Sequence, residues 1–188
     1  MKSEIKKINL EEESYSIEVN NPFEDFSYLR AMEESGSASE TSGWIPDHLG
    51  EIENKKLISF MPLYKKFNSY GEFIFDHQWA NALQRAGRSY YPKLLTAIPF
   101  TPCEGDRILA KNKKNKFNLI DAGIRKMEME QIESWHILFP NEDCKAVLRD
   151  KNFIERLNYR FTWINDNFCD FDNFLSVFTS RQRATIRK

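Results

Sequence analysis

The run LISFMPL at residues 57–63 constrains the fold of this chain most, because it is apolar at nearly every position. A strand of this composition is typically covered on both faces. Residues 44–52 and 56–65 lie on either side of Glu53 and Asn54, and this spacing predicts a hairpin that contains the apolar strand. The chain is therefore expected to fold around a sheet that is buried on both sides.

Helical patterns alternate with strand patterns along the rest of the chain. Asn21 as a cap, Pro22 in the first turn and Gly36 as a stop predict the first helix, with a buried stripe of Phe23, Phe26, Leu29 and Met32. Later helices are expected over residues 76–86 and 117–130 and after Asp170, and later strands over residues 93–100 and 135–139. This alternation predicts the α/β (α+β) class, with helices packed on a mixed sheet.

The segment 153–163 has the clearest alternation of apolar and polar residues, which predicts a strand with one face in the core. Its apolar positions are Phe153, Leu157, Tyr159, Phe161 and Trp163, and its polar positions are Arg156, Asn158, Arg160 and Thr162. The polar face is expected to be solvated or to bind a ligand. We take Arg160 and Trp163 as candidate substrate-binding residues.

Composition limits the classes of function. The chain has 188 residues and a formal net charge of -1, so it carries no global basic field that would recruit nucleic acid or a membrane. The N-terminus lacks an apolar signal segment, and the stretch LISFMPLY is far shorter than a membrane span, so we expect a cytoplasmic protein without membrane insertion. Cys103, Cys144 and Cys169 show no CxxC spacing, which predicts free thiols and no metal site.

The stretch from Asn68 to Ala110 is the candidate functional site, because it holds more polar and aromatic groups than a core needs. Its members fall among turn residues and short apolar runs. They are Tyr70, Gly71, Glu72, Asp76, His77, Trp79, Tyr90, Tyr91, Lys93, Thr101 and Arg107.

Three of these residues are candidate catalytic groups. Glu72 and Asp76 form a pair of carboxylates that could orient a substrate amine, and on a strand their even spacing would place both on one face. His77 at a predicted helix start would favour its neutral form and could act as a base. The structural alternative is a helix-capping Asp76 beside a half-exposed histidine.

The candidate substrate-binding residues are Tyr70, Trp79, Tyr91, Lys93, Thr101 and Arg107. Tyr90 and Tyr91 are either aromatics at the rim of the core or a stacking wall for a flat or sugar-like ligand. Lys93 begins a buried strand, so its ammonium must stay in water, pair with an acid such as Glu72 or Asp76, or meet an anionic ligand. Arg107 follows a turn, a usual way to present a guanidinium to a carboxylate or phosphate. His136 lies in an apolar strand and is expected to be a hydrogen-bonded core histidine.

Several motifs together resemble one known family. They are SYGEFIFD, YYPKLLTAIPFTP, WHILFP and FDNFLSVFTSRQRATIRK. These motifs, with a resemblance over most of the chain from Pro22 onward, are similar to the peptidoglycan biosynthesis or recognition proteins, a Fem-like branch of the GNAT acyltransferase superfamily. Thr162 stands where the family usually has histidine, so a role of that histidine does not carry over.

The resemblance implies an organisation and an activity. The organisation is a leader or first strand over residues 1–20, a single GNAT-like domain over 21–180 with a mixed central sheet flanked by helices, and the start of a basic linker helix over 181–188. A second GNAT-like domain, or a second copy, would complete the cleft. The activity is an N-acyltransferase that moves an amino acid or acyl group onto a peptidoglycan-precursor or peptide-like amine.

The acyl donor is open between acyl-CoA and aminoacyl-tRNA, and no tightly bound cofactor is expected. GNAT enzymes hold the CoA pyrophosphate in a glycine-rich loop, whereas the corresponding stretch TPCEGDRILAKNKKNK contains only Gly105. Lys113 and Lys114 are candidate donor-binding residues in its place, although such a run is usually a solvated loop. A contact with tRNA would use the basic residues Arg181, Arg183, Arg187 and Lys188, which also suit a linker helix.

Two other functions compete with this one. A non-catalytic module that recognises a cell-wall fragment or peptide is favoured by the missing glycine loop and by Thr162. An acetyl-CoA-dependent acetyltransferase of small molecules would require saturable CoA binding through the lysine loop. The crowded stretch from Tyr70 to Arg107 favours an enzyme or half of one.

Overall fold

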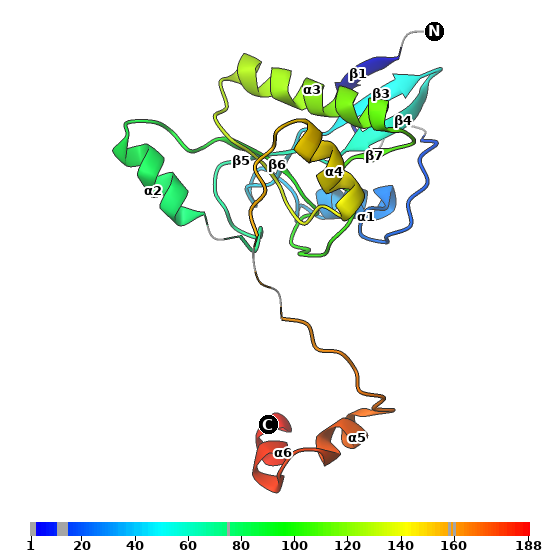
Figure 1. Cartoon of the computed structure of the whole chain (residues 1–188), viewed down its shortest axis with the longest axis vertical. Coiled ribbons are helices and arrows are strands. Elements are labelled where there is room, and N and C mark those ends of the chain that lie inside the picture. Colours follow the sequence, from blue (N-terminus) through cyan, green and yellow to red (C-terminus); the bar gives the residue numbers. More distant parts are fainter. Residues whose placement is uncertain (1–2, 11–14, 75, 158, 160) are drawn as a thin grey trace. The chain divides into compact units, whose positions relative to one another are not determined.

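The computed structural model describes residues 3–10, 15–74, 76–157, 159 and 161–188. It divides the chain into two compact units, Met1–Ile154 and Glu155–Lys188, each of which is described by itself. The described residues form six helices and eight strands in two sheets, so the predicted mixed α/β class is confirmed (Figure 1).

The first unit contains both sheets. One sheet has the order β1-β3-β4-β7, with antiparallel pairs formed by β1 (Glu4–Lys7), β3 (Leu49–Glu53), β4 (Lys56–Met61) and β7 (Leu109–Ala110). The other has the order β2-β5-β6-β8 and consists of β2 (Ile45–Pro46), β5 (Tyr64–Lys66), β6 (Lys93–Thr96) and β8 (Trp135–Ile137). In this second sheet β6 and β8 are parallel, whereas β2–β5 and β5–β6 are antiparallel.

The predicted hairpin is confirmed, with its turn one residue later than expected. Asn54 and Lys55 take the left-handed φ values of 52° and 62° that a two-residue turn between twisted strands requires. The arms of the hairpin continue from β3 and β4 into β2 and β5 of the second sheet, where Ile45 lies opposite Lys65. This hairpin therefore links the two sheets.

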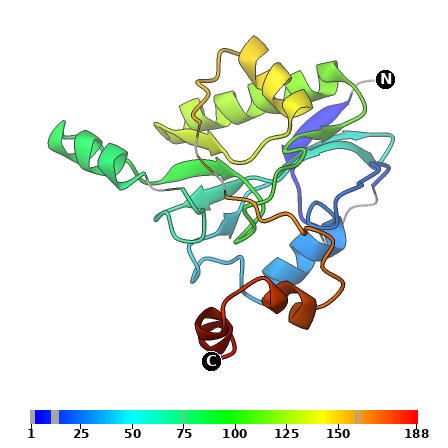
Figure 2. The same ribbon diagram turned by 60° about the horizontal axis from the view of Figure 1, so that its bottom comes forward.

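Helices cover both sides of the sheets, as the apolar run predicted. On one side lie α3 (Lys113–Glu130) and α4 (Glu142–Asp150), and on the other lies α1 (Phe26–Glu34) (Figures 1 and 2). Met61 packs into the core under α3 and α4, while the neighbouring Phe60 packs into the core under α1.

The start of the first helix is a correction. The helix begins at Phe26 rather than near Pro22, because the Asp25 side chain accepts from the Ser27 backbone N–H at 2.8 Å and caps it there. Asn21 instead accepts from the Phe23 N–H at 3.0 Å and holds a preceding turn. Phe23 consequently lies outside the helix and is 39% exposed, although it was expected on the buried stripe.

The helix α2 (His77–Arg85) ends close to the predicted bounds, but it has no buried residue. It connects the inner strands β5 and β6 of the second sheet and extends away from α3 and α4 (Figures 1 and 2). Its pattern of Trp79, Ala82 and Leu83 therefore marks an amphipathic helix whose apolar side is not part of a core.

The second unit contains α5 (Phe171–Ser176) and α6 (Ser180–Ile186). Asp170 caps α5 as predicted, by accepting from the Asn173 N–H at 2.7 Å. Trp163 packs edge-on against Phe174 with ring centroids 5.7 Å apart. These two rings, with Phe168 and Phe171, line a shallow hollow of about 470 Å³.

The predicted strand over residues 153–163 is wrong for the residues that the structure describes. They form no strand, and Leu157 and Phe161 are 91% and 100% exposed, while Phe153 is half-buried against Trp135. Alternation alone does not make a strand, because the backbone groups also need a neighbouring strand to bond. Asn158 and Arg160 lie outside the described residues.

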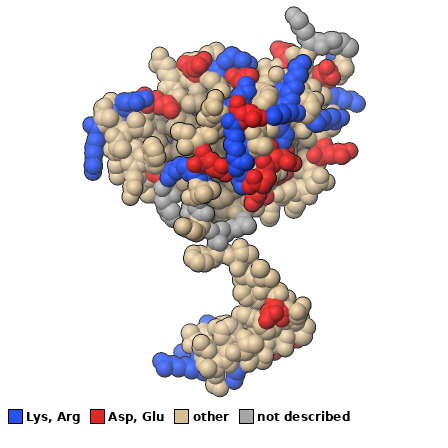
Figure 3. Space-filling model, in the orientation of Figure 1, with Lys and Arg blue, Asp and Glu red and all other residues tan. Residues whose placement is uncertain are grey.

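The surface of the first unit carries charges of both signs. On the face of residues 1–154 seen in Figure 3, Lys and Arg are interspersed with Asp and Glu. Cys103, Cys144 and Cys169 are free, and burial raises the pKa of the Cys144 thiol to about 11. Within the described part of the chain, no helix has the length and apolar character needed to cross a membrane.

Candidate functional site

The centre of the candidate site is Lys93, the first residue of β6, whose side chain is fully buried. Its ammonium donates to Asp76 Oδ2 at 2.5 Å, to Glu72 Oε2 at 2.7 Å and to Ser69 Oγ at 2.8 Å. An ammonium has three N–H donors, so this geometry satisfies all of them. The predicted ion pair of Lys93 with Glu72 or Asp76 is thus confirmed, and Lys93 contacts both carboxylates.

A second buried lysine lies directly opposite Lys93 in the sheet. Lys66 of β5 is the cross-strand partner of Lys93, and like charges in this position repel each other. Glu72 lies between them, with Oε1 4.0 Å from the Lys66 ammonium. Lys66 also donates to the Tyr70 carbonyl at 3.0 Å and lies 4.0 Å from the centroid of the Trp44 ring. The carboxylates therefore make the lysine pair tolerable in a buried sheet.

Burial sets the charge balance of this cluster. It lowers the pKa of Lys66 to about 8, against the opposing effect of Glu72. Burial likewise raises the pKa of Glu72, although the charge of Lys93 opposes it. Burial acts in the same direction on Asp76, but hydrogen bonds from Lys93 and Tyr90 outweigh it and lower the pKa of Asp76 to about 2. Asp76 consequently stays ionised at neutral pH.

The loop between β5 and α2 delivers the carboxylates, so they do not come from a strand as considered above. Gly71 and Phe73 adopt left-handed φ values of 76° and 58°, which turn the chain sharply. A Cβ on Gly71 would lie 2.4 Å from the Phe100 ring, so the turn also needs the small residue. Asp76 stands at the N-cap of α2, but its side chain makes no capping bond and is directed to Lys93 and Tyr90.

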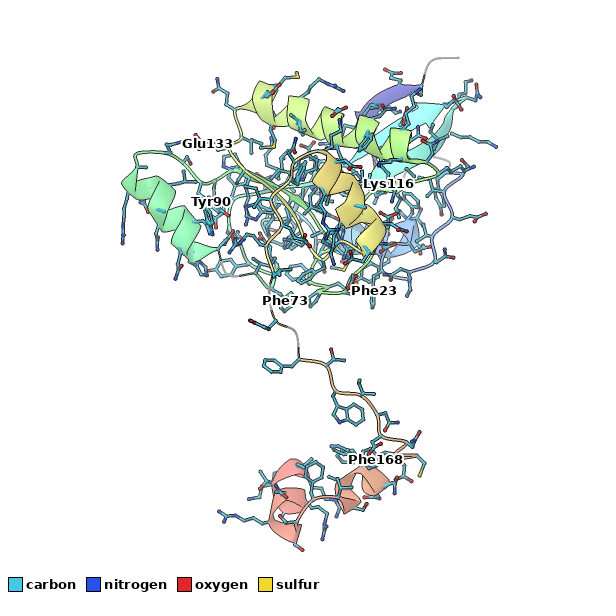
Figure 4. The ribbon with its side chains drawn as sticks, in the orientation of Figure 1. Phe23, Phe73, Tyr90, Lys116, Glu133 and Phe168 are labelled. Carbon is cyan, nitrogen blue, oxygen red and sulfur yellow. The ribbon has the colours of Figure 1, made fainter. Side chains whose placement is uncertain are left out.

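Tyr90 extends the cluster to His136. Tyr90 lies between α2 and the sheet (Figure 4), and its hydroxyl donates to Asp76 Oδ2 at 2.6 Å. The same hydroxyl oxygen lies 3.0 Å from His136 Nε2 on β8. Burial and the neighbouring Asp76 raise the pKa of Tyr90 well above its usual value, so Tyr90 keeps its proton. His136 is half-buried, whereas Asp76 and Lys93 are fully buried.

Two carboxylate oxygens of the cluster have no hydrogen-bond partner among the described residues. They are Glu72 Oε1 and Asp76 Oδ1, and both are buried. An unpaired buried acceptor loses its hydration without compensation, so it has the capacity to accept an N–H from another molecule.

The remaining residues of the predicted site divide by position. Tyr91 lies beside the cluster, with its hydroxyl 2.7 Å from Ser69 Oγ. Tyr70 is 77% exposed. His77 and Trp79 are exposed on α2, and His77 has no contact with the cluster in the described structure. Their proposed roles stay predictions.

Arg107 and Thr101 lie away from this cluster. The buried Arg107 guanidinium donates to the Leu138 carbonyl at 2.8 Å, to the Cys103 carbonyl, and to Glu24 at 3.4 Å. These bonds tie the loop before β7 to the end of β8. Thr101 Oγ1 lies 3.0 Å from the Tyr28 hydroxyl, on the same loop. The Arg107 guanidinium is therefore already bonded to two backbone carbonyls and to Glu24, and not presented to a ligand.

The lysine loop lies at the start of α3. Asn112 accepts from the Asn115 N–H at 2.9 Å and so occupies one of the free amides of the helix N-terminus. Lys113 pairs with Asp150 at 2.6 Å on the surface, and Lys114 is exposed. Lys116 pairs with Asp106 at 2.6 Å. Arg160 lies outside the described residues, and Trp163 belongs to the second unit.

Sequence reasoning missed Lys66 and the link between Tyr90 and His136, whereas the predicted hydrogen bonding of His136 is confirmed. One signal was available for Lys66, because it lies two residues after Tyr64 and therefore on the same face of β5, where Tyr64 is fully buried. His136 could not be found in this way, because the hydrogen bond that connects it to Tyr90 joins residues 46 positions apart in the sequence.

Comparisons with known proteins agree with the motifs. One solved structure, the ribosomal-protein-alanine N-acetyltransferase from Brucella melitensis biovar Abortus 2308, has a TM-score of 0.41 and 11% identity. The alignment covers 88% of this chain and 99% of that one, and a likeness of this size carries no conclusion about activity. No curated protein matches the chain. A family model, FemAB-like, described as peptidoglycan biosynthesis/recognition, matches residues 4–188. Because this match spans almost the whole sequence, the chain belongs to the FemAB-like family.

Proposed function

We propose that this chain is an N-acyltransferase-like domain that acylates the amine of a peptide-like or peptidoglycan-precursor substrate. The observation that carries the proposal is a pair of buried oxygens, Glu72 Oε1 and Asp76 Oδ1, that accept no hydrogen bond from the described residues and lie in an ionised cluster. A substrate ammonium is a donor that suits such oxygens, and carboxylates that hold it would orient its nitrogen for attack. The family's link to peptidoglycan supports the choice of acceptor.

Both oxygens are covered, so a substrate reaches them only when neighbouring groups move. The described part of the loop before α2, residues 67–74, carries the exposed rings of Tyr70 and Phe73 and two left-handed residues. Its outward side chains would then meet the substrate before its carboxylates do.

The acyl donor is part of the proposal, either an acyl-CoA or an aminoacyl-tRNA. A CoA donor would place its phosphates near Lys113 and Lys114, and the double variant Lys113→Ala, Lys114→Ala should then bind CoA more weakly in a calorimetric titration. Unchanged affinity would remove this loop from the site. An aminoacyl-tRNA donor would use Arg181, Arg183 and Lys188 of the second unit, with a second domain or copy to complete the groove.

The test is a transfer assay on the full chain. The acceptor is a UDP-linked muramoyl pentapeptide, the donors are acetyl-CoA and a mixture of aminoacyl-tRNAs, and the readout is the mass of the acceptor. We expect an acceptor heavier by one acyl or aminoacyl group, and loss of this product in Glu72→Gln. Glu142→Gln, which alters an exposed ion pair with Lys145, is the matched control.

A recognition module is the second candidate, and the state of the α3 N-terminus favours it. Asn112 caps this end, and Lys113 and Lys116 are both paired with acids, so the described residues present no ready cradle for a pyrophosphate. Saturable binding of the pentapeptide without any product would support this module. If the pentapeptide neither binds nor is converted to product, both functions are contradicted. We expect a cytoplasmic location for either.

A further inference from the structure

We propose that Lys66 is the proton acceptor of this site, and that its buried side chain takes the proton that a substrate ammonium must lose before acylation. The proposal deepens the acyl transfer proposed above and rests on it for its substrate. An amine attacks a carbonyl carbon only in its neutral form, so a site that acylates an ammonium needs such an acceptor.

The two lysines that face each other in the second sheet differ in the groups that accept their protons. The Lys93 ammonium donates to three side-chain oxygens, so it has no lone pair to offer. Among the described residues, the Lys66 ammonium has one hydrogen-bond acceptor, the Tyr70 carbonyl at 3.0 Å. Its distance of 4.0 Å to Glu72 Oε1 is too long for a hydrogen bond. Of the two lysines, Lys66 is therefore the one that can lose a proton at the smaller cost in hydrogen bonds.

The surroundings of Lys66 also favour its neutral form. Burial lowers the pKa of Lys66 to about 8, and the charge of Lys93 acts in the same direction. Glu72 opposes this shift, and so does the Trp44 ring, whose centroid lies 4.0 Å from the ammonium. These groups come from the facing strand, from the loop before α2 and from the residue before β2. Lys66 consequently exists partly as a neutral amine near pH 8.

The oxygens proposed to hold the substrate lie beside this amine. Glu72 Oε1 accepts no hydrogen bond from the described residues, and it is the carboxylate oxygen 4.0 Å from Lys66. A substrate ammonium that donates to this oxygen would lie next to Lys66 Nζ, and its charge would make Lys66 still easier to deprotonate. The Tyr70 carbonyl bonded to Lys66 belongs to a residue that is 77% exposed, so a movement of this residue would uncover the amine.

The step balances in the following way. Lys66 Nζ takes one proton from the substrate ammonium, and the neutral substrate nitrogen attacks the carbonyl carbon of a thioester or ester donor. The new C–N bond forms, the C–S or C–O bond breaks, and a second proton from the substrate nitrogen goes to the leaving thiolate or alkoxide. Lys66 then returns its proton to water.

A pH titration of the full chain by NMR tests the state of Lys66 without any substrate. The probe is the Cε signal of each lysine, because its chemical shift reports the protonation of the neighbouring Nζ. The Lys66 signal is the one that is missing from Lys66→Met, with Lys66→Gln as a second variant if circular dichroism shows that the first has not folded.

We expect the Lys66 signal to titrate with a midpoint of about 8. In Glu72→Gln the midpoint should be lower, because the carboxylate that favours the ammonium is gone. A Lys66 signal that keeps its ammonium shift up to the range of an ordinary lysine would overturn the proposal. An unchanged midpoint in folded Glu72→Gln would overturn it as well.

The transfer assay tests the role of Lys66 in the reaction. In Lys66→Met, at a temperature where the protein is folded, kcat should fall at least about a hundredfold while KM changes little. The rise of kcat with pH near 8 should also disappear. Lys65→Arg is the matched control, because Lys65 is the next residue of β5 and pairs with Glu130 on the half-exposed side of the strand.

The two measurements separate this inference from the proposed function. If the wild type forms product and Lys66→Met keeps its kcat, another group accepts the proton and this inference alone is wrong. If Lys66 titrates near pH 8 and no product forms, acyl transfer is wrong, and the role of Lys66 in it is wrong too.

Discussion

At the scale of single residues, the buried cluster places four charged side chains where they are removed from water. Lys66, Glu72, Asp76 and Lys93 are almost fully buried, and each would be expensive to bury alone. They are tolerable only as a set, because each charge is compensated by a neighbour. A stability measurement can therefore distinguish a buried network from an ordinary surface ion pair.

Lys93→Met should destabilise the fold by about 3–5 kcal/mol, since it leaves Asp76 and Glu72 buried without their cation. Lys113→Met removes an ion pair of similar length at the surface and should cost less than about 1 kcal/mol. Urea unfolding of both variants tests the contrast. Equal losses would mean that the cluster is not buried as described.

Asp76 should give the protein a dependence on acidic pH. Its pKa is about 2 in the folded state and near 3.8 without contacts, so its contribution is complete above about pH 4 and is lost as the pH falls through 2. The shift corresponds to about 2.5 kcal/mol. In Asp76→Asn this part of the acid-induced loss should vanish from chemical unfolding curves, whereas Asp150→Asn should keep it. An unchanged acid slope in Asp76→Asn would contradict the account.

At the scale of elements, close packing between α3 and β8 is a specific constraint. A Cβ on Gly123 of α3 would lie 2.5 Å from the Trp135 ring of β8. That ring is held by its own N–H, which donates to Thr96 Oγ1 at 3.0 Å. The helix and the sheet therefore approach each other as far as a glycine allows.

Gly123→Ala should destabilise the protein by about 1–3 kcal/mol through overpacking, although alanine favours helices by about 1 kcal/mol over glycine. Trp135→Phe makes room at the same place. The double variant should lose less stability than the sum of the two single variants, as measured by urea unfolding. Additive losses would mean that the two residues do not touch.

How much the sequence could predict differs between elements. Local signals were sufficient for the hairpin, α2 and α5, because an apolar pattern and a turn or cap occur together in each of them. The first helix was placed too early, because Asn21 and Asp25 are both good caps and only the fold shows which is used. The prediction of a strand over residues 153–163 was wrong, because the sequence of a segment does not show whether a neighbouring strand is available to pair with it. The cluster around Lys93 was partly predictable, but its link to His136 depends on β6 and β8 being adjacent.

At the scale of the whole molecule, the first unit contains the members of all three apolar core clusters. The member nearest the C-terminus is Phe153. A chain that ends at Ile154 should consequently unfold cooperatively, with a free energy of unfolding within about 1 kcal/mol of the full chain. Thermal and urea unfolding of both chains test this expectation. A broad melt of the shorter chain would instead support the prediction that residues up to 180 belong to one domain.

The measurement that tests the central claim most directly is the transfer assay with wild type and Glu72→Gln, run beside their unfolding curves. The account predicts an acylated pentapeptide with the wild type and a loss of at least about a hundredfold in rate with Glu72→Gln, at a temperature where both proteins are folded. Equal transfer rates of the two folded proteins would contradict the claim that the buried cluster is a catalytic site.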